Sequence, residues 1–122
     1  LLDTHIVLWL VTADPRLPAQ ALAEVAAASR VLVSTASFWE LTIKTGLGRL
    51  DLDLQELVDG VVDSGLEILP VGVEHAIALR SLPRIHRDPF DRMLIAQARQ
   101  ARLRLVTADA TLAAYGESVT VV

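Results

Sequence analysis

Four carboxylates stand at positions in the sequence from which their side chains could meet. Asp3 follows an apolar pair, and Asp109 follows a short apolar run. Asp91 opens a segment of helical composition, whereas Glu40 lies inside another such segment among apolar neighbours. The carboxyl ends of parallel strands lie at one edge of a sheet, and α/β proteins bind ligands there. We therefore expect these carboxylates to converge.

Converging carboxylates repel one another unless a cation neutralises them. The chain has no Cys, and His5 is the one imidazole expected close to the carboxylates. Oxygen ligands of this kind favour Mg²⁺ or Mn²⁺ over zinc. Mg²⁺ commonly binds one or two carboxylates together with phosphate oxygens of a substrate. The residue types thus point to metal-dependent chemistry on a phosphate ester.

Each carboxylate also has a purely structural interpretation. Asp3 and Asp109 precede helical stretches and could cap them. Asp88 could cap a helix that begins at the Pro that follows it. Glu40 precedes Lys44 by four residues, and such a helical ion pair on an exposed face contributes only about 0.2–0.5 kcal/mol. The metal hypothesis gains weight because four unrelated features would otherwise have to reach the same edge by accident.

The elements that must position these side chains alternate between short apolar runs and longer segments of helical period. Leu1-Leu2 is expected to end a first strand, and the later strands are predicted at Val31 to Val33, Ile68-Leu69, Leu105-Val106 and Val119 to Val122. His5 to Val11 is ambiguous, with helix favoured, and the other helices are predicted at Ala19 to Ser29, Ser37 to Thr45, Leu54 to Ser64, Glu74 to Leu82, Phe90 to Arg102 and Ala110 to Tyr115. Continuous apolar runs are typical of parallel strands covered on both faces. We expect one α/β domain over residues 1–122, with three layers and a mostly parallel central sheet.

Composition narrows the class of protein. The 122 residues carry a formal charge of −4, and 52% of them are hydrophobic, which excludes a disordered or fibrous chain. The longest stretch without a charged residue, Thr4 to Ala13, is too short to span a membrane. The lack of Cys fits a reducing compartment, so we expect a cytoplasmic protein. Because the sequence starts at Leu1 without Met, residues that complete the first strand are expected before it.

Basic residues gather between residues 80 and 104, where seven Arg accompany two Asp. Such runs usually form a solvated helix face, but Arg also suits bidentate contacts to phosphate. The block brackets Asp91, so an RNA could approach the acidic site along a basic edge. Arg84, Arg87 and Arg92 are the candidates for contact with RNA. The large aromatic residues Trp9, Phe38 and Trp39 are expected to pack in the core.

Four segments together resemble PIN-domain proteins of the VapC toxin type. They are LLDTHIVLW from residue 1, VSTASFWEL from residue 33, HRDPFDRMLIAQA from residue 86 and LVTAD from residue 105. The resemblance implies helices around a parallel sheet, an acidic pocket that binds Mg²⁺ or Mn²⁺, and endoribonuclease activity. It also implies a cognate antitoxin as partner and a homodimer.

Carried over to this sequence, the acidic set of the family falls on Asp3, Glu40, Asp91 and Asp109. The implied metal ligands are Asp3, Asp91 and Asp109, while Glu40 either completes the set or accepts a proton from the attacking water. Thr107 occupies the hydroxyl position of the family, where it could orient a ligand or simply close a strand.

Asp88 adds a second acidic residue close to Asp91, and it could cap the helix or face the pocket. Two other classes of protein share some of these features. A response-regulator receiver has a similar layout, but it requires an Asp where the run Val31 to Val33 leads to Ser34. A catalytically silent PIN-like module that only binds proteins is the more serious alternative. Four intact acidic positions favour the nuclease.

Overall fold

A parallel β-sheet forms the centre of the protein. The computed structural model describes residues 1–122. Leu2 bridges in parallel to Val33 on one side and to Val106 on the other, so the end of the expected first strand lies between two pairs of parallel strands. The order across the sheet is therefore β2, β1, Leu2, β3, β4, with bounds Glu67–Leu69 for β2, Leu32–Ser34 for β1, Leu105–Thr107 for β3 and Val119–Val121 for β4.

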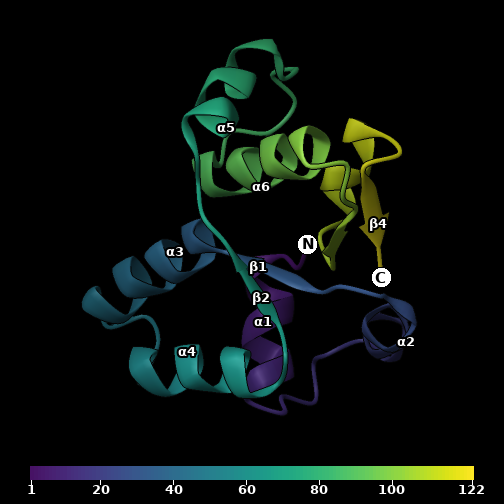
Figure 1. Cartoon of the computed structure of the whole chain (residues 1–122). Helices are drawn as coiled ribbons and strands as arrows, with labels where there is room; N and C mark the ends of the chain where they lie inside the picture. The colour runs from purple at the N-terminus through teal and green to yellow at the C-terminus, as the bar shows by residue number, and fades with distance from the viewer.

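Helices cover both faces of the sheet, which confirms the expected α/β fold. Figure 1 shows α5 and α6 on one side of it, and α1, α2 and α4 on the other. The helices are α1 (Thr4–Val11), α2 (Ala19–Ala27), α3 (Thr35–Gly46), α4 (Leu54–Asp63), α5 (Val73–Ala78) and α6 (Pro89–Gln100), with 3₁₀ helices η1 (Leu79–Ser81) and η2 (Ala110–Tyr115). The segment with the ambiguous pattern, His5 to Val11, is helical. The predicted helix from Glu74 to Leu82 is divided between α5 and η1.

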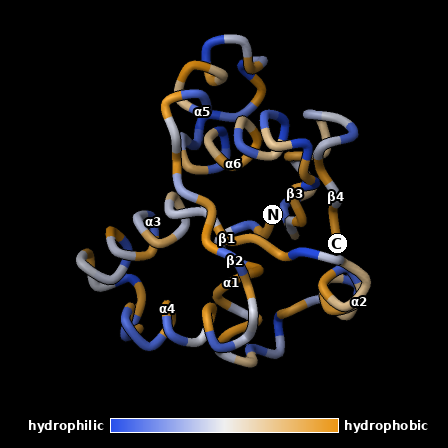
Figure 2. The backbone as a smooth tube through the Cα atoms, in the orientation of Figure 1, coloured by the Kyte–Doolittle hydropathy of each residue, from blue (hydrophilic) through white to orange (hydrophobic).

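Neighbouring apolar residues of the strands point to opposite faces of the sheet. Leu1, Leu32 and Leu105 pack into one buried cluster with α6 and η2. The residues that follow them pack into a second cluster with α1, α2 and α4, and these residues are Leu2, Val33 and Val106. This alternation is the period of two expected of a strand. The hydropathy trace in Figure 2 shows the apolar strands enclosed between the two helical layers.

Short connections place the starts of several helices at one edge of the sheet. Asp3 ends the first strand segment, and α1 begins at the next residue. Ser34 ends β1 and caps α3, since its Oγ accepts a hydrogen bond from the Ala36 N–H at 3.0 Å. Asp109 lies two residues after β3 and caps η2. The sheet thus delivers residues from separate parts of the chain to a single edge.

The prediction that all large aromatic residues lie in the core is wrong for Trp39. The buried side of α3 is formed by Ala36, Ser37, Glu40 and Leu41, and Trp39 is 64% exposed. Trp39 meets the ring of Phe90 edge to face at 5.1 Å between centroids. By contrast, Trp9 and Phe38 are partly buried against the apolar cluster around α1. No helix in the structure combines the length and the apolar character that crossing a membrane requires.

Candidate active site

Thr107 connects two of the predicted carboxylates. Its hydroxyl donates to Oδ2 of Asp3 at 2.6 Å and accepts the Asp109 N–H at 3.0 Å. Because the amide can only donate, the hydroxyl proton is directed at Asp3. Asp3 and Thr107 are both buried, and the Asp3 side chain forms no capping bond to α1. Asp3 therefore starts the helix, but its carboxylate is held in the site rather than used as a cap.

Glu40 carries its carboxylate into the protein from the second turn of α3. The Thr4 hydroxyl donates to Oε1 at 2.9 Å, and Lys44 Nζ lies 2.7 Å from Oε2. Glu40 is only 6% exposed, so the expected pair with Lys44 forms in a partly buried setting. Burial of a charge requires such partners, because an unpaired carboxylate would be strongly destabilising. The ion pair with Lys44 is thus compatible with a role for Glu40 in the metal site.

The start of α6 separates the roles of Asp88 and Asp91. Oδ1 of Asp88 accepts the Phe90 N–H at 2.8 Å and the Asp91 N–H at 3.4 Å, so Asp88 is the N-cap and Pro89 is the first helical residue. The Asp91 carboxylate has no capping duty and faces the other acidic residues. The sequence predicts this helix start, because a capping Asp is followed directly by Pro.

The pKa of Asp91 shows that the carboxylates lie together. Burial first, and then repulsion from nearby carboxylates, together raise it from an ordinary value of 3.8 to about 7; these carboxylates belong to Asp88, Asp3, Glu40 and Asp109. Burial also raises the pKa of Asp3 above its ordinary value. Both effects disfavour the charged form, and a bound cation would counter them.

Asp109 serves as a helix cap and also faces the site. Its Oδ1 accepts hydrogen bonds from the N–H and the hydroxyl of Thr111, at 2.9 and 2.7 Å. These bonds, with the hydroxyl contact first, hold the pKa of Asp109 below its usual value. Its Oδ2 lies 3.7 Å from Nε2 of His86. Asp109 is therefore ionised and has one oxygen free of capping bonds.

His86 belongs to this site, although its place in the sequence, between Arg84 and Arg87, suggests a contact to phosphate and does not pair it with a carboxylate. Its Nδ1 lies 3.5 Å from Oδ2 of Asp91, and ligand atoms from His86, Asp91 and Asp109 can lie within 4.8 Å of one another. A usable signal was its position two residues before the helix cap Asp88, where the chain must run beside the start of α6. His5, the imidazole expected here, is exposed and is absent from this group.

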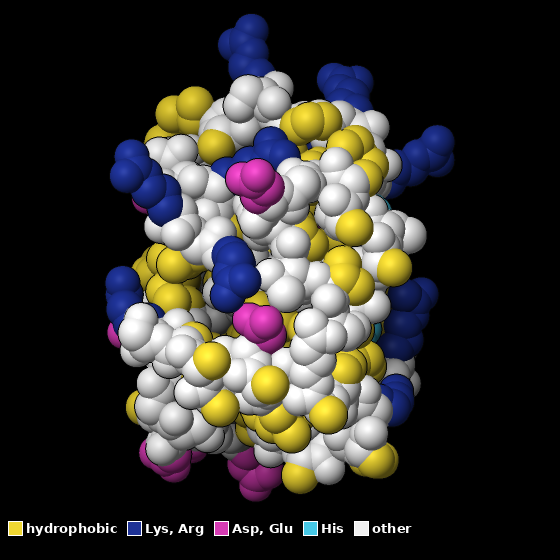
Figure 3. Space-filling model, turned by 90° about the vertical axis from the view of Figure 1, so that its right-hand side faces the viewer, with side chains coloured by type: hydrophobic (Ala, Val, Ile, Leu, Met, Phe, Trp, Pro, Cys, Tyr) yellow, Lys and Arg dark blue, Asp and Glu magenta, His cyan; other side chains and the backbone are white.

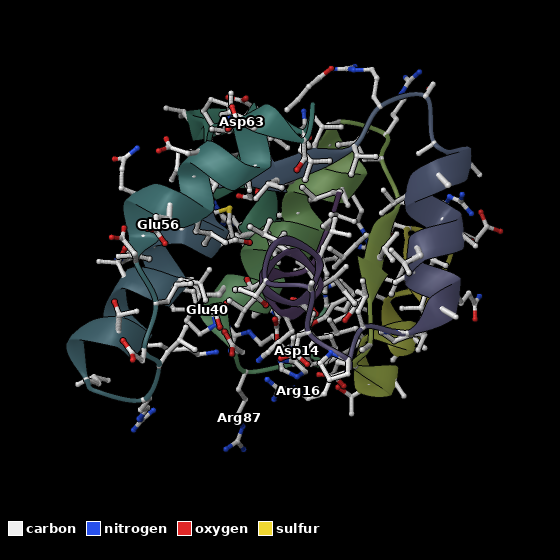
Figure 4. The ribbon with its side chains drawn as sticks, turned by 90° about the horizontal axis from the view of Figure 1, so that it is seen from below. Asp14, Arg16, Glu40, Glu56, Asp63 and Arg87 are labelled. Carbon is white, nitrogen blue, oxygen red and sulfur yellow. The ribbon has the colours of Figure 1, made fainter.

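The three candidate arginines differ in their surroundings. Arg92 turns inward, where its guanidinium donates to the carbonyl of Pro83 at 2.9 Å and to that of Leu82 at 3.4 Å. Arg84 and Arg87 are exposed. Figure 4 shows Arg87 projecting away from the protein at the same edge of the view as Glu40. The contacts of Arg92 hold the loop before α6, whereas the side chains of Arg84 and Arg87 are accessible to a ligand.

Charge is also unevenly distributed on the surface. On the face that carries α2 and β4, basic side chains project from the upper part of the molecule, where Figure 1 places α5 and α6. Acidic side chains lie at the base of the same face, and others lie beside basic side chains in its middle and upper parts (Figure 3).

The donor set suits a hard divalent cation. It consists of carboxylate oxygens and one imidazole, with no thiolate anywhere in the chain. A family model for the PIN domain matches residues 1–118 of the 122. The chain belongs to the PIN-domain family. PIN domains are generally metal-dependent nucleases, and the acidic cluster of this PIN domain fits that chemistry. No curated protein matches the sequence.

Proposed function

We propose that this PIN-domain protein is an endoribonuclease that requires Mg²⁺ or Mn²⁺, hydrolyses phosphodiester bonds of RNA, and acts as the toxin of a type II toxin–antitoxin pair. The observation that supports it best is geometric: Thr107 links Asp3 to the backbone of Asp109, and His86 lies 3.5 Å from Asp91 and 3.7 Å from Asp109. Burial, and then repulsion from the other carboxylates, raises the pKa of Asp91, which agrees with this convergence. Such repulsion is unfavourable for folding, and a bound cation would relieve it.

The residues of the site divide into those that bind the metal and those that position them. Asp3, Asp91 and Asp109 are the proposed ligands, and Glu40 completes the set or accepts the proton of the attacking water. Thr107 holds Asp3 and the backbone of Asp109 in place. When bound, the cation would lower the pKa of water and stabilise charge that develops on the phosphate.

The substrate and partners follow from charge, exposure and family resemblance. Arg84 and Arg87 are exposed on the loop before Asp91, where they could contact RNA phosphates. We also propose a cognate antitoxin and a homodimer as protein partners. Exposed apolar side chains supply surface for such contacts, and the most exposed of them are Trp39, Val73 and Ile77.

Cleavage of RNA tests the proposal directly. Purified protein is incubated with pooled tRNA and rRNA in Mg²⁺, Mn²⁺ or EDTA, beside Asp91→Asn. The matched control is Asp63→Asn, which removes an exposed carboxylate at the end of α4, on the opposite side of the view in Figure 4 from Glu40. We expect metal-dependent cleavage by the wild type and the control, and none by Asp91→Asn.

The catalytically silent module makes the opposite prediction. If the wild type is inert with every metal while it still captures a co-expressed protein partner, the binding module is the correct function. Cleavage that persists in Asp91→Asn would place the chemistry elsewhere. The toxin role is tested separately, since induced expression of the wild type should arrest growth, and that of Asp91→Asn should not.

A further inference from the structure

His86 lies between two acidic residues without forming a close hydrogen bond to either. The distances are 3.5 Å from Nδ1 to Asp91 and 3.7 Å from Nε2 to Asp109. Both exceed the 2.7–3.2 Å typical of a hydrogen bond between nitrogen and oxygen. The side chain of His86 is 24% exposed, so solvent does not surround it. The imidazole ring is thus close to two carboxylates but forms no close hydrogen bond with either of them.

The backbone around His86 is fixed by buried partners. Its N–H donates to the hydroxyl of Tyr115 at 2.9 Å, and Tyr115 is 3% exposed. Arg92 lies 3.4 Å from the same hydroxyl and 3.5 Å from the His86 carbonyl. These contacts join the loop to α6 and to the end of η2. The position of the ring therefore follows from tertiary packing.

Hydrogen bonding identifies which ring nitrogen carries the proton. The Asp88 N–H donates to Nδ1 of His86 at 3.2 Å, so Nδ1 is the acceptor and Nε2 carries the hydrogen. When Asp91 is ionised, Nδ1 and Oδ2 of Asp91 present lone pairs to each other across 3.5 Å. The N–H on Nε2 faces Asp109.

The spacing of these atoms fits a single cation. Two ligand atoms, each about 2.1–2.2 Å from one ion, are separated by about 3.0 Å when adjacent and about 4.3 Å when opposite. The ligand atoms of His86, Asp91 and Asp109 lie within 4.8 Å of one another. The 3.5 Å from Nδ1 of His86 to Oδ2 of Asp91 lies between these two separations, so a small movement would bring both atoms to one ion, and the weak bond from Asp88 would then be replaced.

We propose that Nδ1 of His86 is a nitrogen ligand of the divalent cation, and that it shifts the preference of the site from Mg²⁺ towards Mn²⁺. This inference rests on the proposed metal-dependent function. Mg²⁺ prefers oxygen ligands and keeps its waters, whereas imidazole binds first-row transition ions readily. An acidic site with one imidazole therefore discriminates between ions that carboxylates alone would bind more evenly.

Electron paramagnetic resonance of bound Mn²⁺ tests the proposal without any measurement of activity. The protein is titrated with Mn²⁺ alone, Mg²⁺ affinity is obtained by competition, and pulsed spectra are recorded for nitrogen coupling. We expect coupling to nitrogen in the wild type. His86→Ala should lose it and bind Mn²⁺ at least tenfold more weakly, with a change in Mg²⁺ affinity below about threefold.

His5→Ala is the matched control, because it removes an exposed imidazole that contributes to the electrostatics of Asp3 and Asp109 but is not among the three grouped ligands. It should keep the nitrogen coupling and the preference for Mn²⁺. Mn²⁺ binding without nitrogen coupling in the wild type would overturn the role of His86 alone. Absence of any Mn²⁺ or Mg²⁺ binding would instead overturn the proposed function. The wild-type spectrum decides between these results even if His86→Ala does not fold.

Discussion

Replacing Thr107 with Val should destabilise the protein because it removes two hydrogen bonds without changing the shape of the side chain. The bond to the carboxylate of Asp3 is of the charged kind, which contributes about 1.5–3 kcal/mol, and the bond from the Asp109 N–H contributes about 0.5–1.5 kcal/mol. Thr107 is fully buried, so water cannot replace either partner. We expect the free energy of unfolding to fall by about 2–4 kcal/mol.

Urea unfolding in EDTA, followed by Trp fluorescence, measures this change in the metal-free protein. Thr107→Ser is the control, because it keeps the hydroxyl and loses only a methyl group, for an expected loss of about 1 kcal/mol. Thr107→Val should also weaken Mn²⁺ binding by about 10–100-fold, the effect usually seen when a group that orients a metal ligand is removed.

The comparison of the two variants can refute this reasoning. If Thr107→Val is no less stable than Thr107→Ser, the hydroxyl does not contribute to holding Asp3 and Asp109. If Thr107→Val is destabilised but binds Mn²⁺ normally, the hydroxyl stabilises the fold without positioning a ligand.

Three further predictions concern charged groups. The pKa of Asp91 is higher in the folded state than in the unfolded state, so the free energy of unfolding in EDTA should fall as pH rises from 4 to 8. The rise to about 7 corresponds to about 4 kcal/mol, which solvent access reduces to about 1–2 kcal/mol. Urea titrations should show a smaller fall in Asp91→Asn, because the raised pKa of Asp3 acts in the same direction. Lys44→Met should lower the free energy of unfolding by about 1–3 kcal/mol, because it leaves the buried carboxylate of Glu40 with one partner. The double variant Lys44→Met/Glu40→Gln should recover most of that loss, as a double-mutant cycle would show. Arg87→Ala should reduce the salt dependence of RNA binding by about one ion with stability unchanged within about 0.5 kcal/mol, whereas Arg92→Ala should destabilise the protein by about 1–3 kcal/mol in thermal unfolding.

The sequence predicted the parts of the fold that depend on neighbouring residues. The start of α6 was readable because the cap Asp88 and the first-turn Pro89 are adjacent, and both act locally. The inner strands β1 and β3 were readable because buried parallel strands require continuous apolar runs, whereas the expected burial is wrong for the outer strands β2 and β4, which remain partly exposed. The convergence of Asp3 and Asp109 followed from the topology of such a sheet, in which strand ends share an edge.

Features that depend on distant contacts could not be read in the same way. His86 reaches the site because Tyr115, 29 residues later, holds its backbone. Arg92 resembles the exposed arginines in sequence, but nearby carbonyls of the preceding loop draw it inward. Trp39 is exposed because the inward side of α3 is taken by smaller side chains and by Glu40. In each case the residue type allows either a buried or an exposed side chain, and tertiary packing determines which of the two occurs.

Repulsion among the clustered carboxylates lowers the stability of the metal-free protein, and hydrogen bonds and an ion pair around them reduce this loss. Thr107 and Thr4 donate hydrogen bonds to the buried carboxylates of Asp3 and Glu40, and Lys44 neutralises the second of these. Asp91 has no comparable donor, so nothing offsets the burial and the repulsion that raise its pKa to about 7. The charge that the protein leaves uncompensated is therefore concentrated at the start of α6, beside His86. A cation bound there would relieve this repulsion, so metal binding and folding should stabilise each other.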